Sequence, residues 1–175
     1  QIHAIGVGAP GAIDFDTVLE DGMCVAVELC ALDVAALRLQ GKRHIGIVFN
    51  TDKHYQSGSH WVAVYANIDP SPSSNHFGVF FYDSMARPPP AEVARLYANL
   101  RYQVRAQYGP DVARRFSFDH NRVRRQYRDT ECGLFAIMFL ICCISGRFSC
   151  QEVCHKMGLD EHVHELRAKF FRPPA

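Results

Sequence analysis

Three apolar runs rich in β-branched and aromatic residues lie close together in the middle of the sequence. They cover residues 45–50, 61–68 and 77–83, and each has the length and composition of a buried strand. The segment 69–76 contains two Pro and three Ser, so we expect a hairpin loop there, with antiparallel strands on either side. A short helical pattern at 33–40 precedes the first run.

Helical patterns fill most of the chain after the third run. Apolar residues recur at helical spacing from 93 to 104, between three consecutive Pro and a Gly-Pro stop. Residues 131–144 are almost wholly apolar and predict a buried central helix. Two more helices are expected, one between 149 and 158 from a capping-box pattern and one from 160 toward 171. Strands followed by helices predict an α+β fold with an antiparallel-rich sheet.

The remaining stretches carry weaker patterns. Residues 1–22 are rich in Gly and Asp and are expected to be irregular, whereas residues 23–30 predict a short strand. Residues 111–130 predict a polar connector with one short strand. The length of 175 residues, with 48% hydrophobic and 21% charged residues, fits one soluble globular domain over 1–175.

Charge and cysteine content narrow the class of protein. A net charge of +1 and apolar runs too short for a membrane span argue against a general nucleic-acid or membrane binder. The first ten residues lack the pattern of a signal peptide. Seven cysteines without regular spacing predict reduced, buried thiols in a cytosolic or nuclear protein. Cys150, Cys154 and His155 have no second ligand pair at a suitable spacing, so we expect no metal and no cofactor.

Cys132 begins the apolar helix and is followed directly by Gly133. A helix N-terminus carries partial positive charge and unpaired N–H groups, which favour a thiolate and can hold an oxyanion. Gly133 would allow a substrate backbone to approach closely. Cys132 is therefore a candidate nucleophile; the competing interpretation is a core cysteine that happens to begin a helix.

His60 and Asp83 lie at the ends of neighbouring predicted strands. A hairpin whose loop is residues 69–74 would place His60 directly opposite Asp83. A nucleophilic thiol needs a base, and the base needs a group that orients it, so these two side chains could supply both. Gln126, six residues before Cys132, could donate a side-chain N–H to a developing oxyanion.

The motifs resemble those of the adenain-like and ubiquitin-like-protein (SUMO) cysteine proteases. The matching segments, in the family's order of His, Asp, Gln and Cys, are Gly58–Tyr65, Phe80–Ser84, Gln126 and Cys132-Gly133. Three further segments look like versions from large DNA viruses, namely Phe49–Asp52, Pro88–Pro90 and Phe170–Pro173. The first 40 residues match the family only loosely.

The resemblance implies a papain-like α+β fold, with a central mixed sheet flanked by helices, and catalytic roles for the His, Asp, Gln and Cys of the motif. It also implies a cysteine endopeptidase that cuts after small residues such as Gly-Gly, with Trp61 and Gly133 at a narrow substrate tunnel. The substrate would be a viral precursor polypeptide or a ubiquitin-like protein. The enzyme would be a monomer in the host cytoplasm or nucleus, or packaged in the virion.

Other functions stay open on the sequence alone. A deSUMOylating or deubiquitinating isopeptidase shares the motifs. Some acetyltransferases share the His-acid-Cys order but would need acetyl-CoA and inositol-phosphate sites. The intact set of His60, Asp83, Gln126 and Cys132 argues against a non-catalytic binding module. Eight Arg and two acids in residues 101–128 make an acidic partner or nucleic acid the minor alternative to a solvated face.

Overall fold

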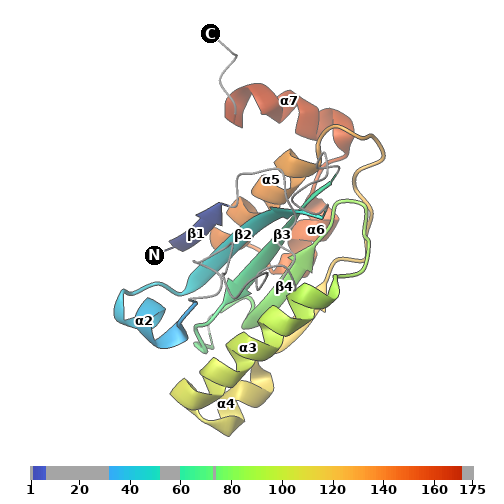
Figure 1. Ribbon diagram of the computed structural model, residues 1–175. Helices are drawn as coiled ribbons and strands as arrows, with labels where there is room; N and C mark the ends of the chain where they lie inside the picture. Colours follow the sequence, from blue (N-terminus) through green and yellow to red (C-terminus); the bar gives the residue numbers. More distant parts are fainter. Residues whose placement is uncertain (1, 7–31, 52–59, 73, 171–175) are drawn as a thin grey trace, which may run out of the picture.

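The computed structural model describes residues 2–6, 32–51, 60–72 and 74–170, and its helices cover both faces of one sheet (Figure 1). The strands are β1 (Ile2–Gly6), β2 (His44–Asn50), β3 (Trp61–Asn67), β4 (Gly78–Tyr82) and β5 (Ser117–His120). The helices are α2 (Val34–Leu39), α3 (Ala91–Tyr108), α4 (Pro110–Arg115), α5 (Cys132–Ile144), α6 (Cys150–Lys156) and α7 (Asp160–Phe170). The predicted central strands and the five predicted helices are confirmed, with small shifts at their ends.

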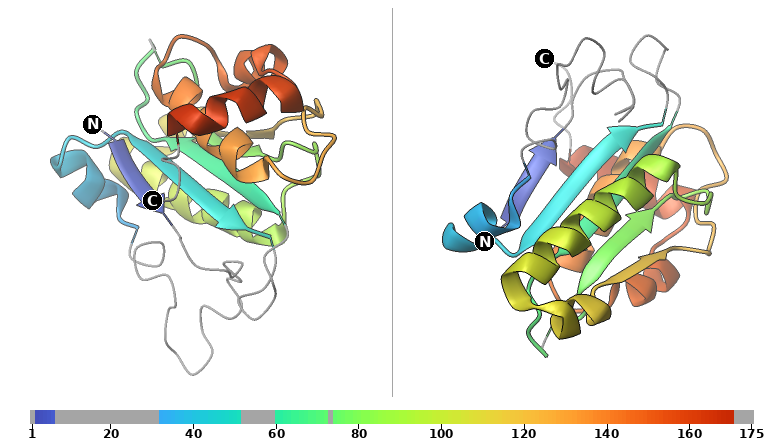
Figure 2. Two further views of the ribbon diagram at one scale, coloured as in Figure 1. Left: turned by 90° about the horizontal axis from the view of Figure 1, so that it is seen from above. Right: turned by 60° about the horizontal axis from the view of Figure 1, so that its bottom comes forward.

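Within the described residues the strand order is β1-β2-β3-β4-β5. Strand β3 pairs antiparallel with β2 and β4, whereas β1 and β5 pair parallel with their neighbours. The sheet is therefore mixed, as predicted, with its antiparallel pairs in the centre. Every residue of β4 is buried because helices lie on both sides of it (Figure 2).

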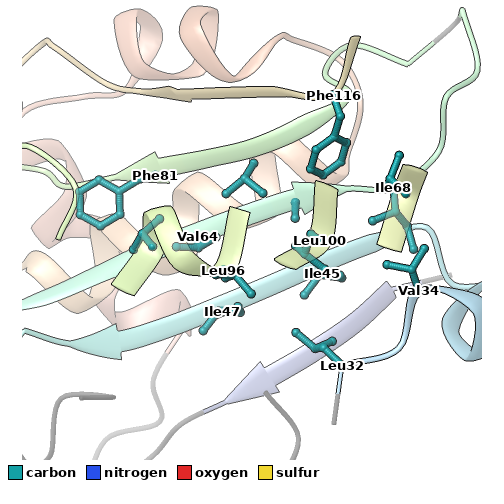
Figure 3. Close-up of a cluster of buried hydrophobic side chains, with 14 of the residues drawn as sticks. Leu32, Val34, Ile45, Ile47, Val64, Ile68, Phe81, Leu96, Leu100 and Phe116 are labelled. Carbon is teal, nitrogen blue, oxygen red and sulfur yellow. The ribbon is translucent and has the colours of Figure 1, made fainter. Parts of the chain in front are cut away.

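Two hydrophobic clusters lie on opposite faces of the sheet. Side chains alternate along β3, so Val62 and Val64 belong to one cluster, and Ala63 and Tyr65 to the other. The first cluster lies under α2, α3 and α4, and Figure 3 shows its side chains between α3 and the strands. This cluster supports the sheet from the face that does not carry α5.

The second cluster lies under α5, whose first residue is Cys132. The ring of Phe139 stacks on Tyr82 with centroids 4.4 Å apart and contacts Phe80 at 5.5 Å. Near β2 the helix comes so close that a Cβ on Gly46 would lie 3.4 Å from Leu140. These contacts hold α5 across the strands and so determine where its N-terminus lies.

Two expectations about secondary structure were wrong. Residues 2–6, expected to be irregular, form β1 and extend the sheet beyond β2. The expected polar connector begins with helix α4, because Gly109 turns the chain at φ 86° and Pro110 suits the first helical position. The predicted strand at 23–30 lies outside the described residues.

The register between β3 and β4 differs by two residues from the one expected. The connection is longer than 69–74, since β3 ends at Asn67 and β4 begins at Gly78. The side chain of Asn67 explains this: it accepts from the N–H of Asp69 (2.9 Å) and donates to the carbonyl of His76 (2.8 Å). A shift of two residues keeps every side chain on its predicted face.

Five cysteines fall within the described residues, and all of them are free thiols. Cys132, Cys143, Cys150 and Cys154 are buried, in agreement with the expectation of reduced, buried cysteines. Among the described helices, none combines the length and the apolar character that a membrane span requires.

Gly78 offers a test of the pairing between β4 and β5. It has φ 146°, and a Cβ there would overlap the carbonyl oxygen of Ser117 on β5. We expect Gly78→Ala to lower the free energy of unfolding by about 2–4 kcal/mol, through strain and steric overlap. Gly109→Ala is the matched control, because Gly109 also has positive φ but open space around it, and its cost should be about 1–2 kcal/mol. Urea unfolding followed by circular dichroism measures both; equal costs would contradict the steric account.

Candidate active site

Three of the predicted residues meet at one end of the sheet. His60 directly precedes β3, Asp83 directly follows β4, and Cys132 is the first residue of α5. His60 Nε2 lies 2.8 Å from Asp83 Oδ1, and His60 also forms a hydrogen bond with the thiol of Cys132. Because β3 and β4 are antiparallel, β3 begins and β4 ends at the same end of the sheet (Figure 1). All three side chains are buried.

The contact between His60 and Asp83 is diagonal rather than directly cross-strand, because of the two-residue difference in register. The backbone of His60 is fixed from the neighbouring strand. Its carbonyl oxygen accepts from the N–H of Thr51 at 2.9 Å and from the hydroxyl of Thr51 at 3.3 Å. Thr51, which directly follows β2, therefore holds the base at the edge of the sheet.

His60 is placed to carry a proton at neutral pH. Burial by itself lowers the pKa of His60, but the hydrogen bonds and charges of Asp83 and Cys132 raise it to about 9. Nε2 faces Asp83, so Nδ1 is the ring nitrogen that remains for the thiol. The carboxylate therefore both orients the imidazole and stabilises its protonated form.

The thiol of Cys132 is placed to lose a proton. Burial raises its pKa, but the hydrogen bond to His60, the backbone N–H groups of Trp61 and Gly133, and the charge of His60 bring it below the ordinary value. The two pKa shifts run in opposite directions, and both favour the state in which His60 holds the proton and the sulfur of Cys132 is a thiolate.

Asp83 is held by groups that sequence reasoning missed. Its Oδ1 accepts from the N–H of Met85 at 2.7 Å. Asn121, which is completely buried, binds the backbone of Asp83 on both sides: its Nδ2 donates to the carbonyl oxygen (2.7 Å) and its Oδ1 accepts from the N–H (2.9 Å). An Asn in an Arg-rich stretch shows no pattern, and only the parallel pairing of β5 with β4 brings it here.

Gln126 joins the site through Ser84, the residue after Asp83. The hydroxyl of Ser84 donates to Gln126 Oε1 (2.5 Å), and Nε2 donates to the carbonyl oxygen of Arg128 (2.5 Å). A carbonyl can only accept, so the oxygen and nitrogen of this buried amide are assigned without ambiguity. The second hydrogen on Nε2 is left for another acceptor. The role of Ser84 was not predicted from the sequence.

Trp61 and Gly133 lie against each other beside Cys132. A Cβ on Gly133 would lie 3.8 Å from the ring of Trp61, so the ring covers the first turn of α5 closely. Trp61 remains partly exposed. The indole ring therefore packs against the first turn of α5, next to the thiol.

The arginines of residues 101–128 have mostly local partners. Arg101, Arg115, Arg124 and Arg125 donate to the carbonyl oxygens of Ala113, Pro70, Gln126 and Cys154, and Arg114, Arg122 and Arg128 pair with Asp111, Asp119 and Glu161. These contacts give the arginines structural roles, which favours a solvated face over a ligand site. Across the described part of the chain, no cluster of His, Cys, Asp or Glu is arranged to hold a metal ion.

The sheet is mixed and has helices on both faces, and a thiol, an imidazole and a carboxylate form one hydrogen-bonded chain at its end. This fold and this site are those of the papain-like cysteine proteases. The chain belongs to the Ulp1 protease family: residues 36–173 match the model for the C-terminal catalytic domain of that family. The matched range contains His60, Asp83, Gln126 and Cys132.

Individual relatives are more distant. A protein of Acanthamoeba polyphaga mimivirus named "Putative thiol protease R355" is 25% identical over 152 residues, which are 85% of this chain and 47% of that protein. The crystal structure of an ASFV protease has a TM-score of 0.62 at 21% identity, covering 76% of this chain and 46% of the other. ChlaDub1 from Chlamydia trachomatis has a TM-score of 0.51 at 17% identity, covering 90% of this chain and 72% of the other. The chain spans about half the length of the first two relatives, and the two solved structures support the fold.

The pKa of Cys132 is lowered and that of His60 is raised. If the leaving group of a substrate must be protonated, these shifts predict a bell-shaped dependence of the reaction rate on pH. Reactivity should rise as the thiolate forms and fall near pH 9 as His60 loses its proton. Asp83→Asn removes the charge and the hydrogen bond that raise the pKa of His60, so the alkaline limb should move down by about 1 pH unit. The dependence of kcat/KM on pH measures both limbs. An alkaline limb that stays in place in Asp83→Asn would contradict this coupling.

Asn121→Ala tests whether the backbone of Asp83 must be held. Loss of the two side-chain hydrogen bonds should lower kcat about tenfold or more, because Asp83 would no longer orient His60 well. It should also lower the free energy of unfolding by about 1–3 kcal/mol, since a buried N–H and carbonyl lose their partners. Asn99→Ala on the exposed side of α3 is a suitable control. Wild-type kcat in a folded Asn121→Ala variant would exclude the role.

Proposed function

We propose that this chain is the catalytic domain of a cysteine endopeptidase that cleaves a polypeptide after small residues of the Gly-Gly type. The observation that carries the proposal is the buried chain of hydrogen bonds from Asp83 through His60 to Cys132. Membership of the Ulp1 protease family supports the reaction type. The indole ring of Trp61 packs over Gly133. This packing supports a preference for small residues next to the cleaved bond, because bulky side chains would meet the ring.

In the proposed reaction, the Cys132 thiolate attacks the substrate carbonyl carbon, and the negative charge moves to the carbonyl oxygen. The free hydrogen on Gln126 Nε2 and the backbone N–H of Cys132 are the proposed donors to this oxyanion. His60 then gives its proton to the leaving amine as the C–N bond breaks, which forms a thioester. Water, deprotonated by His60, hydrolyses the thioester and returns the thiol. Asp83 holds the imidazole in place throughout.

For the substrate we propose a viral precursor polypeptide, because the mimivirus and ASFV relatives are viral proteins. The matching location is the host cytoplasm or nucleus, or the virion, with the domain acting as a monomer. The second candidate is a ubiquitin-like protein, which the family's kinship with Ulp1 supports. Acetyl transfer has less support, because most arginines of residues 101–128 already have local partners.

Intact-mass labelling would separate these candidates. The protein is treated in parallel with an electrophilic peptide ending in Gly-Gly, a SUMO vinyl probe and a ubiquitin vinyl probe. We expect one adduct with the peptide, located on Cys132 and absent in Cys132→Ala. Burial raises the pKa of the thiols at Cys142, Cys143 and Cys154, so they should stay unmodified.

Adducts with a folded probe but not with the peptide would move the assignment to removal of a ubiquitin-like tag. Adduct formation that persists in Cys132→Ala would refute the proposed nucleophile. His60→Ala should slow labelling about a hundredfold or more, because the thiol would lose its base.

A further inference from the structure

Helix α7 lies across the start of α5, next to the segment that joins Gln126 to Cys132 (Figures 1 and 2). The helix is anchored to the second hydrophobic cluster by Val163, which is fully buried. Its polar residues on the same side contact residues 127, 128 and 131. No step of the proposed reaction uses α7, so these contacts need a separate explanation.

Glu131, which directly precedes the thiol, carries a buried carboxylate. The side chain is only 3% exposed, and it makes no capping hydrogen bond to α5. Its Oε1 lies 2.7 Å from His164 Nδ1 and its Oε2 lies 3.1 Å from Arg167 Nη1, so both of its basic partners come from α7. The hydroxyl of Thr130 also donates to Oε1, at 3.4 Å. Burial raises the pKa of this carboxyl, but the hydrogen bonds and charges of His164 and Arg167 lower it below its ordinary value. An ionised, buried carboxylate is stable only where such partners are in place.

Asp160 holds the other end of the same segment. It is the first residue of α7 and is 4% exposed. Its Oδ2 accepts from the N–H of Tyr127 at 2.8 Å, and its Oδ1 from the N–H of Arg128 at 3.4 Å. The carbonyl of Arg128 in turn accepts from Gln126 Nε2. Helix α7 is thus bonded to the segment both beside the oxyanion donor and beside the nucleophile.

We propose that α7 is a brace that fixes the distance between Gln126 and Cys132, and that Glu131 and Asp160 are its positioning residues. The proposal rests on the peptidase function proposed above, because it assigns the brace to that reaction. A rigid segment matters there: a displacement of about 1 Å between reacting groups costs on the order of a hundredfold in rate. The exposed ion pair between Arg128 and Glu161 adds little, since both side chains are mostly in water.

The test compares Glu131→Ala, Asp160→Ala and Arg167→Gln with Glu165→Gln, an exposed acid on the same helix, as the matched control. With a Gly-Gly peptide substrate, the first two variants should lower kcat about tenfold or more and leave KM within about twofold. Arg167→Gln should lower kcat less than Glu131→Ala does, because the carboxylate of Glu131 keeps its contact with His164. The control should match the wild type.

A second readout does not depend on any substrate. The rate of Cys132 alkylation by iodoacetamide is measured against pH, under conditions where circular dichroism shows a folded protein. In Glu131→Ala the midpoint of this profile should move up toward that of an ordinary thiol, because the sulfur would lose its contact with His60. If Glu131→Ala shifts the midpoint but the wild type cleaves no peptide, the positioning role of α7 is supported and the proposed peptidase activity is refuted. If Glu131→Ala does not fold, Asp160→Ala decides the question. An unchanged midpoint and unchanged kcat in the folded variants would overturn the proposal.

Discussion

The packing of α5 against the sheet is the interaction on which the site depends. Phe139 stacks on Tyr82, and Leu140 approaches Gly46 so closely that a Cβ there would already be in van der Waals contact with it. These apolar contacts are about two helical turns away from Cys132, yet they decide that the N-terminus of α5 lies over the end of the sheet where β3 begins and β4 ends. The core thus places the thiol, and the strands place its base.

His60, Asp83 and Gln126 are each held in addition by a polar neighbour. Thr51 holds the backbone of His60, Asn121 holds that of Asp83, and Ser84 orients the amide of Gln126. These neighbours are themselves drawn from the ends of strands or from the connector after β5. Buried polar contacts of this kind are costly if incomplete, so the same bonds that position the site also specify one arrangement of the chain.

Much of this could be predicted from the sequence, and for identifiable reasons. Strand runs and the apolar helix gave the sheet, α5 and the closeness of His60 to Asp83, because alternation and helical periodicity report burial directly. The loop after Asn67 was misjudged because its length depends on side-chain hydrogen bonds, which leave no periodic pattern. Asn121 and Glu131 were missed for a related reason: their partners are 38 and 33 or more residues away, and a single sequence does not show such contacts. The assignment of catalytic roles stays a prediction.

The order of these residues along the chain has a consequence for biosynthesis. His60 and Asp83 precede Gln126 and Cys132, and the residues of α7 that bind this segment, Asp160, His164 and Arg167, come later still. A chain that grows from its N-terminus therefore presents the imidazole and carboxylate first, the sulfur next, and the helix that holds the sulfur's segment last. On the role proposed for α7, the thiol of a nascent chain lacks this support until residue 167 has emerged, so the synthesis of the cysteine and its activation are separated in time.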